Sequence, residues 1–98
     1  MNSLLTSVLE TANLFRKCDK YSQSTILKEE CAELIIAISH FERNREGSFN
    51  EMLEELSHVL ISCFAFIICA DIPVEDLIAE VNKKYNKYHF LKSEVKKP

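Results

Sequence analysis

The chain has 98 residues, of which 47% are hydrophobic and 28% charged, and it contains one glycine and two prolines. This composition excludes a disordered tail, a collagen-like repeat and a turn-rich β-sandwich, and the length fits one domain. The net charge of −3 is unevenly distributed: residues 1–82 hold 6 Lys/Arg against 14 Asp/Glu, and residues 83–98 hold 6 Lys against one Glu. A predominantly acidic body argues against a nucleic acid polymer as the partner.

The first predicted helix runs from Leu4 to Phe15, because apolar residues recur there at helical spacing before a polar break at residues 17–21. A second helix is predicted from apolar residues three and four positions apart. They form a seam that suits packing against another helix. The seam residues are Leu27, Cys31, Leu34, Ile38 and Phe41.

A third helix is predicted from a seam with the same spacing. Ser48 and Glu51 have the spacing of a capping box, which makes Ser48 the predicted N-cap of this helix. Pro73 suits the first turn of a fourth helix that reaches about Phe90, followed by a Lys-rich tail from about residue 91. The seam of the third helix consists of Leu53, Leu56, Leu60, Cys63 and Ile67. We therefore expect a single all-α domain over residues 1–98, a protomer of the four-helix bundle type.

The third helix is apolar on nearly every side between Val59 and Ala70. A small bundle does not easily cover such a helix, so we expect a homodimer or larger homo-oligomer. The 12-residue run is shorter than the roughly 20 residues of a bilayer span, and no basic signal-peptide start precedes it. The four cysteines form no C-x-x-C pair, which indicates reduced core residues. The expected protein is cytoplasmic and makes no membrane contact.

Three glutamates form an E-E-x-x-E pattern in the second helix: Glu29, Glu30 and Glu33. Glu30 and Glu33 share one helix face, and like charges at this spacing cost about 0.2–0.5 kcal/mol per pair. None of the three has a Lys or Arg three or four positions away. Carboxylates among apolar neighbours are costly unless a positive group lies between them.

The third helix carries Glu55 and His58, also three positions apart. Glu30 with His58, and Glu33 with Glu55, have the same sequence midpoint, residue 44, which lies in the polar connection between the two helices. In an antiparallel hairpin with equal rise along both helices, these four side chains converge. Oxygen-rich ligands suit Mg²⁺ or Mn²⁺, which also bind substrate phosphates.

These two clusters resemble the motifs of the MazG-like, all-α nucleoside triphosphate pyrophosphatases. That family includes dCTP and dUTP pyrophosphatases and phosphoribosyl-ATP pyrophosphohydrolase, and it has E-E-x-x-E on one helix and E-x-x-D on the next. The resemblance covers residues 23–88 and implies hydrolysis of an NTP or dNTP to the monophosphate and pyrophosphate. It also implies a homodimer, or a tetramer built from two dimers.

The resemblance implies site residues, which we carry over one by one. The metal ligands would be Glu30, Glu33, Glu55 and His58, the last in the place where the family usually has Asp. Glu29 and Glu30 would be catalytic, holding a metal or the attacking water. The substrate would be bound by Gln23 and by three residues of the fourth helix: Asn82, Lys84 and Lys87. The cofactor would be Mg²⁺ or Mn²⁺, with His58 favouring the softer Mn²⁺.

Three other functions stay open at this stage. With His58 in place of Asp, the protein could be a degenerate nucleotide-binding protein. It could also be a helical dimerisation module without activity. Glu55 and His58 form an E-x-x-H, which in a dimer resembles a di-iron carboxylate bundle.

Overall fold

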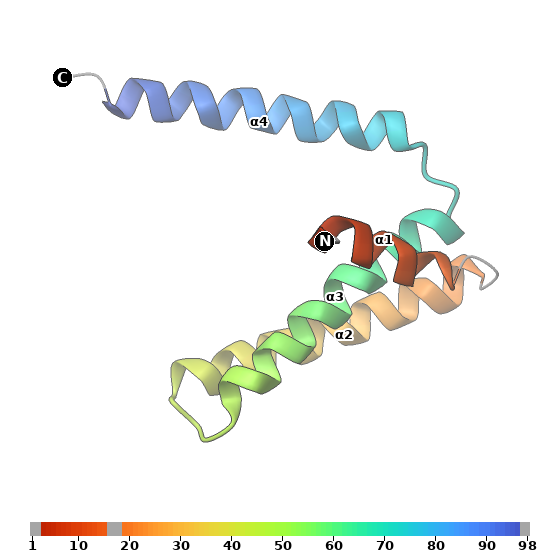
Figure 1. Ribbon diagram of the computed structural model, residues 1–98, viewed down its shortest axis with the longest axis vertical. Helices are drawn as coiled ribbons and strands as arrows, with labels where there is room; N and C mark the ends of the chain where they lie inside the picture. Colours follow the sequence, from red (N-terminus) through yellow and green to blue (C-terminus); the bar gives the residue numbers. More distant parts are fainter. Residues whose placement is uncertain (1–2, 16–18, 97–98) are drawn as a thin grey trace.

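The computed structural model describes residues 3–15 and 19–96, and this part of the chain forms four helices without any strand (Figure 1). They are α1 (Leu4–Asn13), α2 (Lys20–Glu42), α3 (Ser48–Cys69) and α4 (Val74–Lys96). The prediction of an all-α protein is therefore confirmed. One boundary was predicted too early: α4 continues past Phe90 to Lys96, because no Gly or Pro interrupts this stretch.

The start of α2 is determined by Asp19. Its carboxylate accepts hydrogen bonds from the backbone N–H groups of Tyr21 (2.9 Å) and Ser22 (3.0 Å) and from the Ser22 hydroxyl. The hydrogen bonds from Ser22, and then that from Tyr21, hold the pKa of Asp19 below its ordinary value. The predicted break at residues 17–21 extended too far, since this cap begins the helix at Lys20. The first part of that break lies outside the described residues.

The predicted capping box at the start of α3 is wrong. The N-cap residue is Gly47, with φ of 76°, and no side chain caps this end. Ser48 is the first helical residue and is buried, while the Glu51 carboxylate lies 3.0 Å from the Nδ1 atom of His40 at the end of α2. The tight αL turn, which glycine adopts without steric cost, displaces the start by one residue.

The residues of α2 and α3 that are fully buried are polar or small. Ser62 and Ala65 of α3 are buried, as are Gln23 and Ala37 of α2. The predicted seams are only partly covered within one chain: Leu53, Leu56 and Leu60 remain 48%, 37% and 40% exposed, whereas Cys63 and Ile67 are half-buried. The close approach of two helices favours small side chains in the interface, which turns the larger leucines outward.

α1 packs against α3 through Val8 and Ala12, both buried, and the Cys69 thiol donates a hydrogen bond to the carbonyl oxygen of Phe15. Cys31 was expected in the core but is exposed, whereas Cys63 is half-buried and burial raises the pKa of its thiol, with Cys31 adding to the rise. Cys31 and Cys63 form no disulfide. Cys18 lies outside the described residues.

α4 does not join the other three helices. Within the described chain, its backbone packs against none of them, and every residue from Val74 to Leu91 is exposed. Figure 1 shows it as a separate rod connected to the end of α3 by a short turn. The expected four-helix protomer thus has three packed helices and one unpartnered helix.

α3 is long and apolar enough, by length and composition, to cross a membrane. The comparison of the 12-residue apolar run with the length of a bilayer span did not identify this helix, because it counted only the uninterrupted run between Val59 and Ala70. A core helix of a soluble protein passes the same test, so a single helix of this kind is weak evidence for a membrane span. The first half of α3 also carries Glu51, Glu55 and His58, whose burial in lipid is expensive. The absence of membrane contact stays a prediction.

Candidate metal centre

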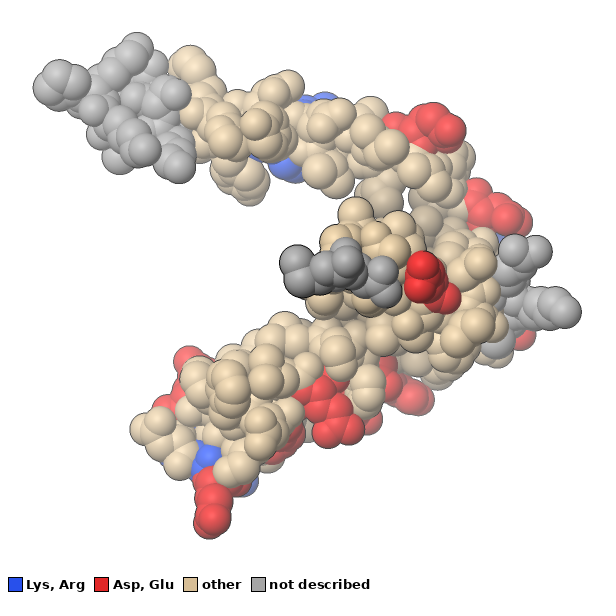
Figure 2. All heavy atoms as spheres, in the orientation of Figure 1, with Lys and Arg blue, Asp and Glu red and all other residues tan. Residues whose placement is uncertain are grey.

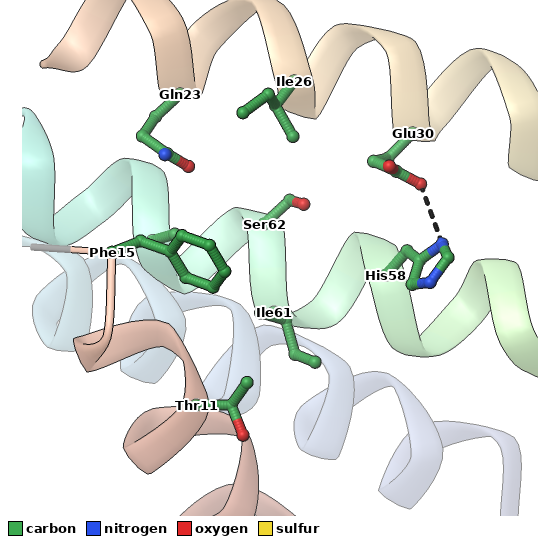
Figure 3. A pocket seen from close by; sticks show the side chains of 9 residues that line it. Thr11, Phe15, Gln23, Ile26, Glu30, His58, Ile61 and Ser62 are labelled. Carbon is green, nitrogen blue, oxygen red and sulfur yellow. Dashed lines mark ion pairs between the residues drawn. The ribbon is translucent and has the colours of Figure 1, made fainter. Parts of the chain in front are cut away.

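Glu30, Glu55 and His58 bring their polar atoms together between α2 and α3. The Oε2 atom of Glu30 lies 3.2 Å from Nδ1 of His58, and Oε2 of Glu55 lies 3.6 Å from the same nitrogen. One donor atom from each residue falls within 4.8 Å of the others. Figure 3 shows Glu30 and His58 pointing toward one another from the two helices. The predicted register of the hairpin, with Glu30 opposite His58, is therefore confirmed.

The three donor atoms are buried and unsatisfied. Oε2 of Glu30, Oε2 of Glu55 and Nδ1 of His58 are all shielded from solvent, and none of them makes a hydrogen bond. The contact between the Glu30 carboxylate and the His58 imidazole therefore has the distance of an ion pair but not the geometry of a hydrogen bond. Buried polar atoms normally have a hydrogen-bond partner, so three that face one point form a site that a cation would satisfy.

A divalent cation fits this donor set. Two carboxylate oxygens and one imidazole nitrogen are ligands that Mn²⁺, Fe²⁺ and Zn²⁺ accept, whereas Mg²⁺ prefers oxygen alone. Three protein ligands leave coordination positions for water or substrate. The side chains are partly open to solvent, with exposures of 21% for Glu30, 16% for Glu55 and 42% for His58, so a ligand has access.

Glu29 and Glu33 lie outside this cluster. Both are exposed on α2, and neither contributes a donor atom to the group formed by Glu30, Glu55 and His58. Within the described residues, no Lys or Arg forms an ion pair with Glu29, Glu30, Glu33 or Glu55. Their predicted roles, Glu33 as a ligand and Glu29 as a catalytic acid or base, stay predictions.

The three predicted substrate residues of α4 are not near the cluster. Asn82, Lys84 and Lys87 are exposed, and none of them lines the cavity that contains Glu30 and His58. Asn82 instead borders an apolar groove between α1, α3 and α4. Figure 2 shows acidic side chains over the α2–α3 hairpin and basic side chains along α4, whose first turn is itself acidic. Within one chain, Lys84 and Lys87, the predicted phosphate-binding cations, are thus separated from the acidic cluster.

Gln23, the remaining predicted substrate residue, is close to the cluster. It is 2% exposed and lines a cavity of about 230 Å³ that also contains Glu30 and His58. Sequence reasoning missed the α1 side of this cavity, formed by Thr11 and Phe15, because no pattern indicated where α1 crosses. It also missed the His40–Glu51 pair, although the two residues lie at the matching ends of the predicted hairpin.

The chain is similar to curated proteins named phosphoribosyl-ATP pyrophosphatase. The chain is 34% identical over 59 residues to those of Bacillus cereus (strain AH820), Bacillus anthracis (strain A0248) and Bacillus thuringiensis (strain Al Hakam). The match covers 60% of this chain, and the chain spans about half the length of the curated relatives it matches. This similarity confirms the resemblance seen in the two acidic motifs.

No family model matches the chain. No solved structure matches it either.

Proposed function

We propose that this protein is a metal-dependent nucleoside triphosphate pyrophosphohydrolase, which cleaves an NTP or dNTP to the monophosphate and pyrophosphate. The observation that carries the proposal is the convergence of three unsatisfied donor atoms, from Glu30, Glu55 and His58, on one point between α2 and α3. The similarity to pyrophosphatases supports the same reaction class. A di-iron site and a module without activity remain the outcomes against which the proposal is tested.

Glu30, Glu55 and His58 would hold the cation, with Glu33 as a further ligand. A bound divalent cation supplies charge neutralisation for the triphosphate and lowers the pKa of a water molecule. The water oxygen attacks the α-phosphorus, the bond between this phosphorus and the αβ-bridging oxygen breaks, and pyrophosphate leaves. Glu29, one residue before a ligand and exposed to solvent, accepts the proton of the water.

The cations of α4 act across a subunit boundary in this proposal. Lys84 and Lys87 stabilise negative charge on the departing pyrophosphate. Since α4 stands apart from the cluster of its own chain, a second copy supplies these side chains, in a homodimer or a tetramer. The exposed leucines of α3 and the exposed apolar residues of α4 provide surface for such an assembly.

Turnover on a panel of NTPs and dNTPs tests the proposal, with Mg²⁺ in one set and Mn²⁺ in the other. We expect pyrophosphate and the matching monophosphate in equal amounts, with faster turnover in Mn²⁺. E55Q is expected to lose at least about 100-fold in rate, because a donor at the convergence point loses its charge. E54Q is the matched control, since Glu54 is the adjacent exposed glutamate.

Two outcomes would contradict the proposal. Absence of pyrophosphate with either cation, for every nucleotide, would leave a binding or dimerisation module. Visible absorption after loading with Fe²⁺ in air, without pyrophosphate release, would favour the di-iron alternative. E33Q in the same assay shows whether exposed Glu33 is needed, since only a ligand role predicts a large loss.

A further inference from the structure

The cavity beside the acidic cluster has a polar group at one end and the cluster at the other. It has a volume of about 230 Å³ and lies where α1, α2 and α3 meet. Its walls are mainly apolar and include Phe15, Ile26 and Ile61, while Glu30 and His58 form one end. Figure 3 shows these side chains around one space, with Gln23 at the opposite end from the Glu30–His58 pair.

Gln23 is the unusual residue of this cavity. It is 2% exposed, and its Nε2 atom is buried without a hydrogen-bond partner among the described residues. A buried amide left unpaired is destabilising, and no described residue accepts a hydrogen bond from this one, so it favours a ligand that brings an acceptor. Ser62, also buried, adds a hydroxyl to the same lining. The cavity therefore combines apolar walls with convergent polar groups, as binding sites for small planar molecules do.

The volume suits a single ring. An engineered apolar cavity of roughly 150 Å³ holds one benzene molecule, so a cavity of 230 Å³ holds a six-membered ring with its oxygen or nitrogen substituents. A purine adds a second, fused ring to that size. The side chain of Phe15 lines the cavity and offers an aromatic face to a planar ring.

We infer that this cavity binds the base of the nucleotide, that the base is a pyrimidine, and that the Gln23 amide recognises a carbonyl oxygen on its edge. The inference rests on the proposed function, which places the triphosphate at the acidic cluster. A ring seated against Gln23 directs its sugar and phosphates toward Glu30 and His58, because these residues form the other end of the same cavity. In the complex, Nε2 of Gln23 donates a hydrogen bond to the carbonyl oxygen of the base.

Nuclear magnetic resonance tests the inference, with diamagnetic Mg²⁺ present at one fixed concentration to neutralise the carboxylates that face the phosphate. In the ¹⁵N-labelled full-length chain, the side-chain amide signal of Gln23 is followed while dUMP, dCMP, dAMP, dGMP or 2-deoxyribose 5-phosphate is added. We expect dUMP and dCMP to shift this signal and saturate it at the lowest concentrations. The base-free sugar phosphate is expected to leave it unchanged. Equal shifts with dAMP and dGMP, or no shift with any nucleotide, would overturn the inference.

A variant series adds an independent measurement. Q23L keeps the size of the side chain and removes the amide, so pyrimidine binding is expected to weaken by about tenfold or more. S24A is the matched control, because Ser24 is the next residue of α2 and does not line the cavity. Circular dichroism confirms that each variant is helical, and the wild-type nucleotide panel decides the question even if Q23L does not fold.

The two proposals fail in different ways. Pyrophosphate release at equal rates from purine and pyrimidine nucleotides, with no response of Gln23, overturns the pyrimidine pocket and leaves the pyrophosphohydrolase standing. Binding of dUMP and dCMP at Gln23, without pyrophosphate from any triphosphate, supports the pocket and overturns the proposed reaction.

Discussion

α2 and α4 each have 23 residues, yet only α2 finds partners within the chain. α2 packs along α3, and its Glu30 lies 3.2 Å from His58 of that helix. α4 exposes apolar and basic residues alike, including Leu77 (36% exposed) and Ile78 (52%). Contacts within one chain therefore hold α2 and α3 together as a hairpin, with α1 packed on α3, but they do not hold α4. The apolar residues of α4 imply a partner that one protomer does not contain.

The groove between α1, α3 and α4 also indicates that α4 binds a partner. It has a volume of about 530 Å³ and is almost wholly apolar, with Leu5 and Leu9 of α1 facing Leu77 and Ile78 of α4. An apolar groove of this size is unfavourable when it is exposed to water. We expect a second copy of the chain to fill it.

The largest expected effect comes from charging α4. The double variant L77E/I78E places two carboxylates in the apolar groove and is expected to abolish self-association. Light scattering after size exclusion would then give a mass near 11.3 kDa, that of one chain. Pyrophosphate release is expected to fall with it, since Lys84 and Lys87 of the second copy are lost. K83A, on an exposed position of α4, is the control; an unchanged oligomer in L77E/I78E would contradict the role of this helix.

The next effect concerns the hairpin cluster alone. H58D replaces the imidazole at the convergence point by a third carboxylate, which is expected to raise the affinity for Mg²⁺ on the order of tenfold relative to Mn²⁺. Thermal unfolding at increasing concentrations of each metal measures this change. H89D, on exposed α4, is expected to change neither affinity. Equal metal affinities in the wild type and H58D would show that His58 is not a ligand.

A smaller effect is expected at the turn that joins α2 and α3. Gly47 has a φ of 76°, and an added Cβ meets nothing within 4 Å, so G47A creates strain without a clash. The left-handed conformation costs an alanine about 1–2 kcal/mol. Urea unfolding is expected to show this loss, with E46A, the preceding residue, close to wild type. A G47A variant as stable as wild type would show that the turn relaxes freely.

The smallest effect is expected at the start of α2. The pKa of Asp19 is lowered in the folded chain, so its contribution to stability is present above the ordinary pKa of an aspartate and is lost as the pH falls through the lowered value. D19N keeps a capping oxygen that does not titrate. The difference in melting temperature between pH 7 and pH 3 is therefore expected to be narrower in D19N than in wild type. An identical difference in both proteins would exclude Asp19 as a source of the pH dependence.

The register of the hairpin could be predicted from the sequence because both helices rise equally per residue. Glu30 and His58 are equidistant from residue 44, and they meet in the structure. The same midpoint relates Gln23 to Ala65, and both are buried. The same geometry predicted that Glu55 and Glu33 would join the Glu30–His58 pair. Glu55 does, but Glu33 stays exposed, because the twist of one helix about the other decides which neighbour faces inward.

The sequence by itself determined the four helices and the pairing of Glu30 with His58 across the α2–α3 hairpin, because helical spacing and the rise per residue are local properties. Only the tertiary structure decided which faces of α2 and α3 meet. Small residues allow the close approach, so Ser62 and Ala65 lie inside while Leu56 and Leu60 remain exposed. The burial of Gln23 beside the acidic cluster and the separation of α4 from the other helices could also be seen only in the structure. Both depend on packing between segments that are distant in the chain.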